Sequence, residues 1–370
     1  MPKVTYNNKG AVFFPSLKKA VEDYFSDRQL KKTGNWKLYI KTAVLFTLAV
    51  AAYLTLLLVP MPILPGILLS TVFGIILAGI GFDVMHDACH GSYSTKKWVN
   101  ELLGLSLNAL GGNAFFWKQK HNIIHHTYTN VDGIDDDIAK NPIMRMCSTQ
   151  PWVPAHRYQH IYVPFLYTLS SIFWVFIQDP IKYATQKVYR TALPKMDTKE
   201  HIIFWVSKLL YLVVYIAIPI LAVGWLPWLI GFLCMHMALG FTLTIVFQLA
   251  HVVEETEFEF VDETLNIENE WAIHQIKTTA NFSPGSKIIS WFVGGLNFQI
   301  EHHLFPRISH IHYPAISKIV EAKCREFGIR YNSIPNIMKA VNSHFRFLKE
   351  IGRQPVPVRV AQKPLPEAAI

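Results

Sequence analysis

Two long apolar blocks constrain this chain more than any other feature of its sequence. Residues 42–85 contain no lysine or arginine, and residues 202–250 contain only Lys208. A helix that crosses a bilayer needs about 20 mostly apolar residues. Each block is therefore long enough for two membrane spans joined by a short turn.

Helix-breaking residues divide each block near its middle. Prolines cluster at 60–65 in the first block, and Gly224 and Pro227 interrupt the second. The predicted spans lie near residues 42–59, 63–83, 202–223 and 228–250. Only 16% of the chain is charged and 51% is hydrophobic, whereas a soluble domain carries about 25% charged residues. We therefore expect an all-α integral membrane protein with four transmembrane helices.

The distribution of positive charge predicts the orientation of these spans. Both predicted turns lack lysine and arginine, and nearly all of the 35 basic residues lie outside the spans. The positive-inside rule then places both termini and the middle segment in the cytoplasm. Residues 160–179 are also long enough to span, but a fifth span would separate the histidine clusters described next. We interpret this segment as an interfacial helix.

Three histidine clusters follow the spans: "HDACH", "HNIIHH" and "NFQIEHH". Together with the histidine that ends the fourth span, they supply these candidate metal ligands: His86, His90, His121, His125, His126, His251, His302 and His303. All of them fall at one membrane face in the predicted topology. We expect a cytoplasmic helical domain there that caps the spans and holds the metal.

The spacing within the clusters predicts two metal ions rather than one. Residues four apart on a helix, such as His86 and His90 or His121 and His125, project from the same face. Adjacent histidines point about 100° apart, so a doublet such as His302 and His303 can reach two different metals.

Three further polar residues are candidates for a weaker role. Gln299 lies three and four residues before the last doublet and shares its helix face. We interpret Gln299 as a residue behind the ligands, with direct ligation as the alternative. His274 and Asp137, which belongs to an acidic triplet, are expected near the site; the triplet is interpreted mainly as a tether for loops or histidine rings.

The chemistry of these ligands limits which metal ions and which kinds of metal site are expected. Imidazole suits iron, zinc and copper. The chain has no HExxH motif of zinc metalloproteases and no Glu-x-x-His pair within its spans, as a carboxylate di-iron bundle would have. A histidine-bound iron pair that activates dioxygen beside the bilayer remains, and an unactivated lipid chain is a substrate that needs such chemistry.

The three clusters resemble the histidine boxes of the membrane fatty acid desaturases. The resemblance covers roughly residues 43–328 and extends along "GGLNFQIEHHLFPRISHIHYP". The glutamine that opens the last box is similar to the front-end type, which adds a double bond between an existing one and the carboxyl end. The resemblance implies two iron ions, dioxygen as co-substrate and the eight histidines above as ligands. The charge distribution, the resemblance and the Pro-rich end of the chain together predict a cytoplasmic N-terminal arm (1–41), a desaturase domain (42–330) and a C-terminal helix with a flexible tail (331–370).

Partners follow from the same resemblance. The fused haem-binding domain of many front-end enzymes, with its His-Pro-Gly-Gly motif, is missing here. Electrons are therefore expected from a separate ferredoxin or small cytochrome with its reductase. A net charge of +9 would attract an acidic donor and anionic membrane lipid; no nucleic-acid partner is expected. The missing fusion favours a bacterial inner membrane over the endoplasmic reticulum.

The substrate is expected to be a fatty acyl-CoA or acyl-lipid, held in an apolar tunnel shaped by Phe115, Phe116 and Trp117. A sphingolipid desaturase or an acyl hydroxylase with the same site remains an alternative. A membrane metal carrier is a more distant one, because such a path needs polar residues at mid-membrane and only His236 lies there.

Overall fold

The computed structural model describes residues 4–140, 142–260 and 265–353. The predicted flexible tail, residues 354–370, lies outside the described residues. The helices are α1 (Phe13–Asp27), α2 (Trp36–Leu58), α3 (Ile63–Ile80), η1 (Gly81–Met85), α4 (His86–His90), α5 (Lys97–Gly104), α6 (Ser106–Ala109), α7 (Ala114–Trp117), η2 (Lys118–His125), η3 (Pro154–Tyr158), α8 (Gln159–Phe173), η4 (Trp174–Gln178), α9 (Asp179–Thr185), α10 (Thr198–Leu212), η5 (Val213–Ala217), α11 (Ile218–Val223), α12 (Trp225–His251), α13 (Trp271–Thr278), α14 (Lys287–Phe292), α15 (Gln299–Leu304), η6 (His310–His312), α16 (Tyr313–Glu326) and α17 (Ile337–Arg353).

The fold is mostly helical, but it contains small strand pairs that an all-α expectation leaves out. These are β1 (Thr5–Tyr6) with β6 (Asn266–Ile267), β2 (Val131–Asp132) with β5 (Glu259–Phe260), β3 (Lys187–Val188) with β4 (Thr191–Ala192), and β7 (Asn281–Phe282) with β8 (Ser333–Ile334). Only the third pair is antiparallel. The three parallel pairs each fasten one segment to another that is distant in the sequence, whereas β3 and β4 form a tight hairpin.

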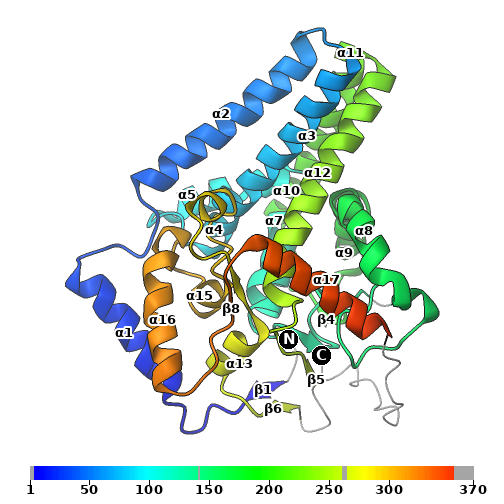
Figure 1. Cartoon of the computed structure of the whole chain (residues 1–370). Coiled ribbons are helices and arrows are strands. Elements are labelled where there is room, and N and C mark those ends of the chain that lie inside the picture. Colours follow the sequence, from blue (N-terminus) through cyan, green and yellow to red (C-terminus); the bar gives the residue numbers. More distant parts are fainter. Residues whose placement is uncertain (1–3, 141, 261–264, 354–370) are drawn as a thin grey trace.

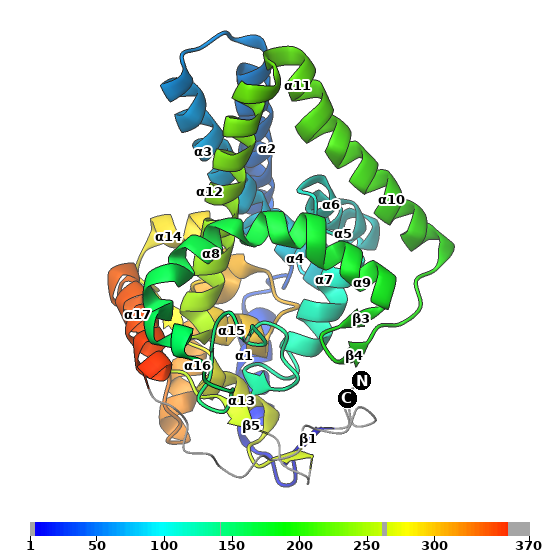
Figure 2. The same cartoon turned by 90° about the vertical axis from the view of Figure 1, so that its right-hand side faces the viewer.

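Five helices are long and apolar enough to cross a membrane by length and composition: Trp36–Leu58, Ile63–His90, Pro154–Thr185, Thr198–Val223 and Trp225–His251. Four of them contain the spans predicted from the sequence. The remaining one, Pro154–Thr185, contains the segment interpreted as interfacial. Figure 2 shows α8 lying across α12 rather than along it.

The bundle is held by close packing of α3 against α12 (Figure 1). A Cβ atom on Gly74 would collide with the carbonyl of Met235, so the small residue permits the helix backbones to approach. Gly224, with φ 84°, ends α11 in a conformation that suits glycine and reverses the chain into α12. As a result α12 runs antiparallel to α11 and parallel to α3, and the last turns of Ile63–His90 and Trp225–His251 reach the same end of the bundle.

The part of the molecule beyond this end packs around that junction. Helices α1, α13, α15 and α16 share a hydrophobic cluster that includes Leu17, Ile276, Ile300 and Ile316. Helix α17 packs on α8 and α12. The histidine clusters lie between these helices and the bundle.

Candidate metal centre

The first cluster extends directly from a membrane-type helix. Helix α3 continues through the wide turn η1 into α4 without a break. His86 and His90 lie one turn apart, with ring centroids 4.7 Å from each other. Asp87, between them, accepts a hydrogen bond from Ser309 Oγ at 2.6 Å and lies 3.0 Å from His310 Nδ1. This contact fixes the cluster against the loop after α15.

The second cluster is not on the regular helix that the sequence predicts. Residues Lys118–His125 form a π-helix, in which the backbone N–H of His126 bonds to the carbonyl of His121 at 3.0 Å. A π-helix has more residues in each turn than an α-helix, so the directions in which the histidine side chains project are changed. His121 Nε2 consequently lies 3.3 Å from His86 Nε2 and 3.2 Å from His126 Nε2.

The third cluster lies on the short helix α15. Glu301, buried beside the doublet, accepts hydrogen bonds from Asn281 Nδ2 and Tyr331 OH, both at 2.8 Å. Asn281 belongs to β7 and Tyr331 lies two residues before β8, so this strand pair anchors the helix. Burial raises the pKa of Glu301 to about 7, although the hydrogen bonds from Asn281 and Tyr331 oppose the shift.

The histidines form two buried donor sets. In set 1, one nitrogen from each ring lies within 4.8 Å of the others; its members are His86, His90, His121 and His302. In set 2 the same holds for His125, His251 and His303. The adjacent residues His302 and His303 therefore belong to different sets. His126 lies between them, with ring centroids 4.6 Å from His302 and 4.4 Å from His303.

The outer nitrogens of three rings are held by protein groups. His125 Nδ1 donates to Asp135 Oδ2 at 3.0 Å. His302 Nδ1 lies 3.1 Å from the Tyr313 hydroxyl, and His303 Nδ1 donates to Gln275 Oε1 at 2.9 Å. Partners of this kind fix the tautomer and leave the opposite nitrogen free to bind a metal.

The inner nitrogens have no such partners. Among the described residues, the buried Nε2 atoms of His90, His125, His302 and His303 lack hydrogen-bond partners, as do both ring nitrogens of His251. Buried polar atoms are normally paired. Bare nitrogens that converge from several elements are the donor set of a transition metal, for which nitrogen ligands lie about 2.0–2.1 Å from an ion such as zinc. The residues thus fit a metal.

Electrostatics distinguish His125 from the other clustered histidines. Burial lowers the pKa of His121, of His302 and of His303 well below the usual value, so these rings are neutral and able to bind a metal. Burial acts on His125 in the same direction, but the carboxylate of Asp135 outweighs it, with help from Asp137, and the pKa of His125 is raised.

An apolar cavity of about 620 Å³ adjoins set 1. His86, His121 and Trp117 line it, together with the side chain of Gln299. Charged residues stand on one part of its wall: Lys120, Asp136, Asp137, Lys140 and Lys182. Lys120 Nζ lies 2.6 Å from Asp137 and 3.0 Å from Asp136.

Two of the three aromatic residues expected to shape the tunnel lie elsewhere. Phe115 and Phe116 join a separate hydrophobic cluster with Phe204 and Met196. Consecutive residues of a helix turn about 100° from each other, so three neighbours in α7 cannot all face one cavity. Only Trp117 has the direction that the prediction required.

The weaker candidates lie near the donor sets. Gln299 is buried and lies beside His251, although no hydrogen bond of normal geometry joins them. His274 Nε2 donates to the carbonyl of Thr129 at 2.9 Å, so it holds the loop after η2. Asp137 Oδ2 lies 3.4 Å from His125 Nδ1, farther than Asp135.

Sequence reasoning did not single out Asp135, Gln275 or Tyr313 as the residues behind the ligands. Asp135 carries the only local signal, as part of the acidic triplet. Gln275 and Tyr313 reach the doublet from helices of their own, and only the fold brings them there. Lys41, which forms an ion pair with the buried Asp83, was missed for the same reason.

An apolar helical bundle that ends in buried histidine donor sets beside an apolar cavity defines a membrane-type metalloprotein that can hold a lipid chain. Comparison with known proteins gives the family. The sequence pattern described as "Fatty acid desaturase" matches residues 60–335.

Similar proteins carry desaturase names. The chain is 35% identical to the "sn-1 linoleoyl-lipid 6-desaturase" of Arthrospira platensis over 95% of this chain and 96% of the relative. It is 36% identical to the protein of the same name from Synechocystis over 91% and 94%. It is 34% identical to the "Acyl-lipid (8-3)-desaturase" of Physcomitrium patens over 92% and 72%. The chain belongs to the fatty acid desaturase family and is an oxidoreductase that desaturates fatty acyl chains.

Proposed function

We propose that this desaturase is a front-end, acyl-lipid enzyme that uses two iron ions and dioxygen. The observation that carries the proposal is the pair of all-histidine donor sets, one of which lines the apolar cavity. The names of the relatives, which specify lipid-linked chains and positions near the carboxyl end, support the lipid substrate and the regiochemistry.

The proposed iron ligands are the eight clustered histidines, divided as in sets 1 and 2, with His126 between them. Gln299 is proposed to act from behind the ligands, because it contacts both the cavity and the neighbourhood of His251. Asp137 and His274 are proposed as supports rather than ligands. Bound iron would supply the dioxygen activation that removal of hydrogen from an unactivated chain requires.

The protein itself would bind the lipid, position its acyl chain and exclude water. The charged wall segment around Lys120 and Lys140 is suited to the polar end of a lipid, and the apolar remainder to its acyl chain. His86 and His121 then lie beside the chain. Apolar walls exclude water from this position and hold one pair of neighbouring carbons near the metal ligands.

We further propose four membrane spans, with Pro154–Thr185 at the interface. Helices α5, α8 and α14 lie at the same end of the bundle as the histidines (Figure 2). Exposed tryptophans accompany lysines there: Trp36 with Lys37, Trp98 with Lys97, and Trp291 on α14, which begins at Lys287. Such residues concentrate where a membrane meets water.

The orientation and the domain division complete this proposal. Both termini and the histidines would lie in the cytoplasm, most simply at a bacterial inner membrane. Residues 1–41 would be the arm, 42–330 the desaturase domain and 331–370 the C-terminal segment. A separate ferredoxin or small cytochrome would supply electrons, attracted by the basic charge of this face.

Expression in a host that lacks polyunsaturated lipids, with defined fatty acids supplied, tests the function. Mass spectrometry of the lipids should find a new double bond on the carboxyl side of an existing one, and purified protein should contain iron. A hydroxylated chain or a desaturated sphingolipid base as the sole product would overturn the proposal in favour of those activities. Metal binding without any lipid product would favour a carrier.

Topology has its own test. Single cysteines introduced at Pro62 and Gly224 should react with an impermeant reagent applied outside the cell, whereas a cysteine at Asp137 should react only after the membrane is opened. External labelling at position 137 would place the histidines on the other face.

A further inference from the structure

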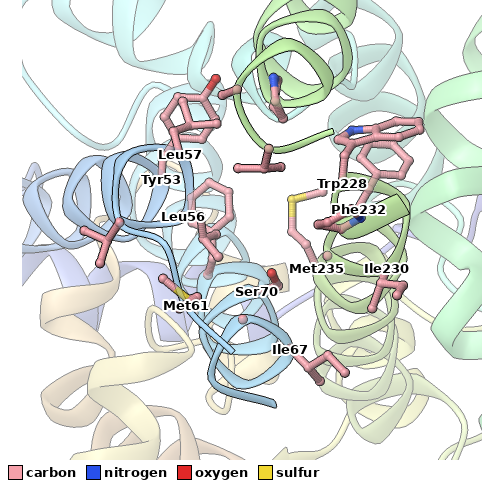
Figure 3. Close-up of a pocket in the computed structure, with 18 of the residues that line it drawn as sticks. Tyr53, Leu56, Leu57, Met61, Ile67, Ser70, Trp228, Ile230, Phe232 and Met235 are labelled. Atoms are coloured by element: carbon pink, nitrogen blue, oxygen red, sulfur yellow. The ribbon is translucent and has the colours of Figure 1, made fainter. Parts of the chain in front are cut away.

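A second apolar cavity, of about 650 Å³, lies at the other end of the bundle. Helices α2, α3, α11 and α12 surround it. Figure 3 shows Tyr53, Leu56, Ser70, Phe232 and Met235 around its interior. We call it the outer cavity, and the cavity beside set 1 the inner cavity. The two are stacked along the bundle, because α12 lines the outer one up to Met235 and the inner one from Leu239 onward.

A buried polar contact fills the position between the two cavities. His236, between Met235 and Leu239 on α12, is fully buried. Its Nδ1–H donates to Ser171 Oγ at 2.9 Å, and Ser171 donates in turn to the His236 carbonyl at 2.8 Å. The Tyr211 hydroxyl donates to His236 Nε2 at 2.6 Å. The contact joins α8, α10 and α12 with every polar atom of the imidazole satisfied.

The ring of Tyr211 closes the same boundary. On one side it stacks on Tyr215, with centroids 4.7 Å apart, and Tyr215 lines the outer cavity. On the other side it lies against Gly111, where a Cβ atom would come within 2.7 Å of the ring and 2.9 Å of Val175. Val175 lines the inner cavity. Tyr211 lines neither cavity itself but lies between Tyr215 of the outer cavity and Val175 of the inner cavity.

We infer that Tyr211, held by His236 and Ser171, is the floor of the acyl-chain site and limits the length of chain beyond the position of desaturation. This inference rests on the proposed function. The polar end of the lipid belongs at the charged wall around Lys120, so the methyl end points toward this floor. From Gln248 to Leu239 the inner cavity follows about 14 Å of helix, and no chain can extend farther unless the floor opens.

A hydrogen-bonded contact at this depth gives a more rigid floor than apolar side chains would give. Three paired groups in an apolar environment resist separation, because an unpaired one costs about 1–3 kcal/mol. A floor of apolar side chains could yield to one more methylene by changing rotamer. The Tyr211–His236–Ser171 contact fixes the ring in place and so gives a sharp length limit.

The test compares competing substrates of two lengths. The host described above receives equal amounts of linoleic acid and its homologue two carbons longer, and the ratio of long to short product is measured. Tyr211→Ala should join the two cavities and raise this ratio about tenfold or more, since one methylene in an apolar pocket is discriminated by about 10–200-fold. Leu239→Phe should shift the ratio in the opposite direction, because it raises the floor.

Two matched variants distinguish the effect of the Tyr211 ring from the effect of its hydrogen bond and from a general loosening of the helix packing. Tyr215→Ala enlarges only the outer cavity and should keep a ratio close to that of the wild type. Tyr211→Phe keeps the ring but loses the hydrogen bond to His236, so it should raise the ratio less than Tyr211→Ala does. A wild-type ratio in folded, active Tyr211→Ala would overturn the inference, as would an equal shift in Tyr215→Ala. If Tyr211→Ala does not accumulate, a wild-type ratio in Leu239→Phe overturns it. Absence of front-end product from the wild type would instead refute the proposed function.

Discussion

Two regions of this molecule bury histidines equally well and use them in opposite ways. In the metal centre, the Nε2 atoms of His125, His302 and His303 have no partner among the described residues. Where α17 packs on α8, His344 is equally buried, but its Nδ1–H donates to the Val252 carbonyl at 2.6 Å and its Nε2 accepts from Tyr167 OH at 2.9 Å. Burial alone does not distinguish the two regions.

The difference lies in the number of ring nitrogens that protein groups satisfy. A neutral imidazole has one donor and one acceptor. At His344 both are used, so the ring acts as a bridge between elements. At His125, His302 and His303 one nitrogen is held from behind and the other is bare, an arrangement that is costly unless something else binds there. The pairing of the ring nitrogens therefore indicates a metal site in one region and a structural role in the other.

The largest expected effect is the loss of a ligand. His90→Ala, His302→Ala and His303→Ala should each reduce desaturation by more than about 100-fold, since even residues behind metal ligands matter by about 10–100-fold. Each variant should lose metal mainly from its own set, while insertion into the membrane is unchanged. Product analysis by mass spectrometry and metal analysis of purified protein check this.

His344→Ala is the matched variant from the other region. It should keep its metal but lose about 1–3 kcal/mol of stability, because the Val252 carbonyl and the Tyr167 hydroxyl are left without their partner. Loss of metal in this variant at normal stability would erase the distinction between the regions.

The next effect concerns the residues behind the ligands. Asp135→Asn removes a charged acceptor from His125 and should lower metal affinity in set 2 by about 10–100-fold. Tyr313→Phe removes a neutral hydroxyl from His302 and should have a smaller effect, since a charge-assisted hydrogen bond is roughly twice as strong. Chelator competition on the two purified variants measures the difference. An equal loss in both would mean that the charge of Asp135 is irrelevant.

Only those features of the two regions that depend on neighbouring residues could be predicted from the sequence. Membrane-length apolar helices and the histidine clusters follow from composition and spacing. Four helices overlap the predicted spans, although the first begins at Trp36 rather than near residue 42 and the second continues to His90. The π-helix at η2 does not follow, because the i+4 spacing of His121 and His125 suits a regular helix equally well. Its consequence is that these two residues belong to different sets.

Contacts between distant segments account for the rest. Nothing near Gln275 or Tyr313 marks them as partners of the doublet, and only its isolation in the sequence separates His344 from the clustered histidines. Phe115 and Phe116 were misplaced because the direction of a four-residue helix cannot be read from its composition. Pairing of ring nitrogens is a property of the folded chain.

Gln299 sharpens the comparison at the boundary of the metal centre. It lines the cavity and lies beside His251, but a neutral amide is a weaker donor than imidazole. Gln299→Ala should therefore reduce turnover by about tenfold while iron content changes little. Loss of iron as complete as in His303→Ala would make Gln299 a ligand, and no change in either quantity would make its position incidental.

The smallest effect is a dependence of stability on pH that arises outside the metal centre. Burial lowers the pKa of His344 to about 4, whereas an exposed histidine titrates near about 6.5. The unfolded chain therefore binds a proton more readily between these values, so the stabilising contribution is complete above about pH 6.5 and declines as the pH falls toward 4. Lowering the pH from about 6.5 to about 5.5 should reduce the free energy of unfolding by about 1 kcal/mol through this residue.

His344→Gln keeps a donor and an acceptor but cannot titrate, so thermal unfolding in detergent should show a smaller loss of stability with acid than the wild type. An unchanged slope in His344→Gln would mean that His344 accepts a proton without breaking its contacts, and the division between bridging and ligand histidines would then need another basis.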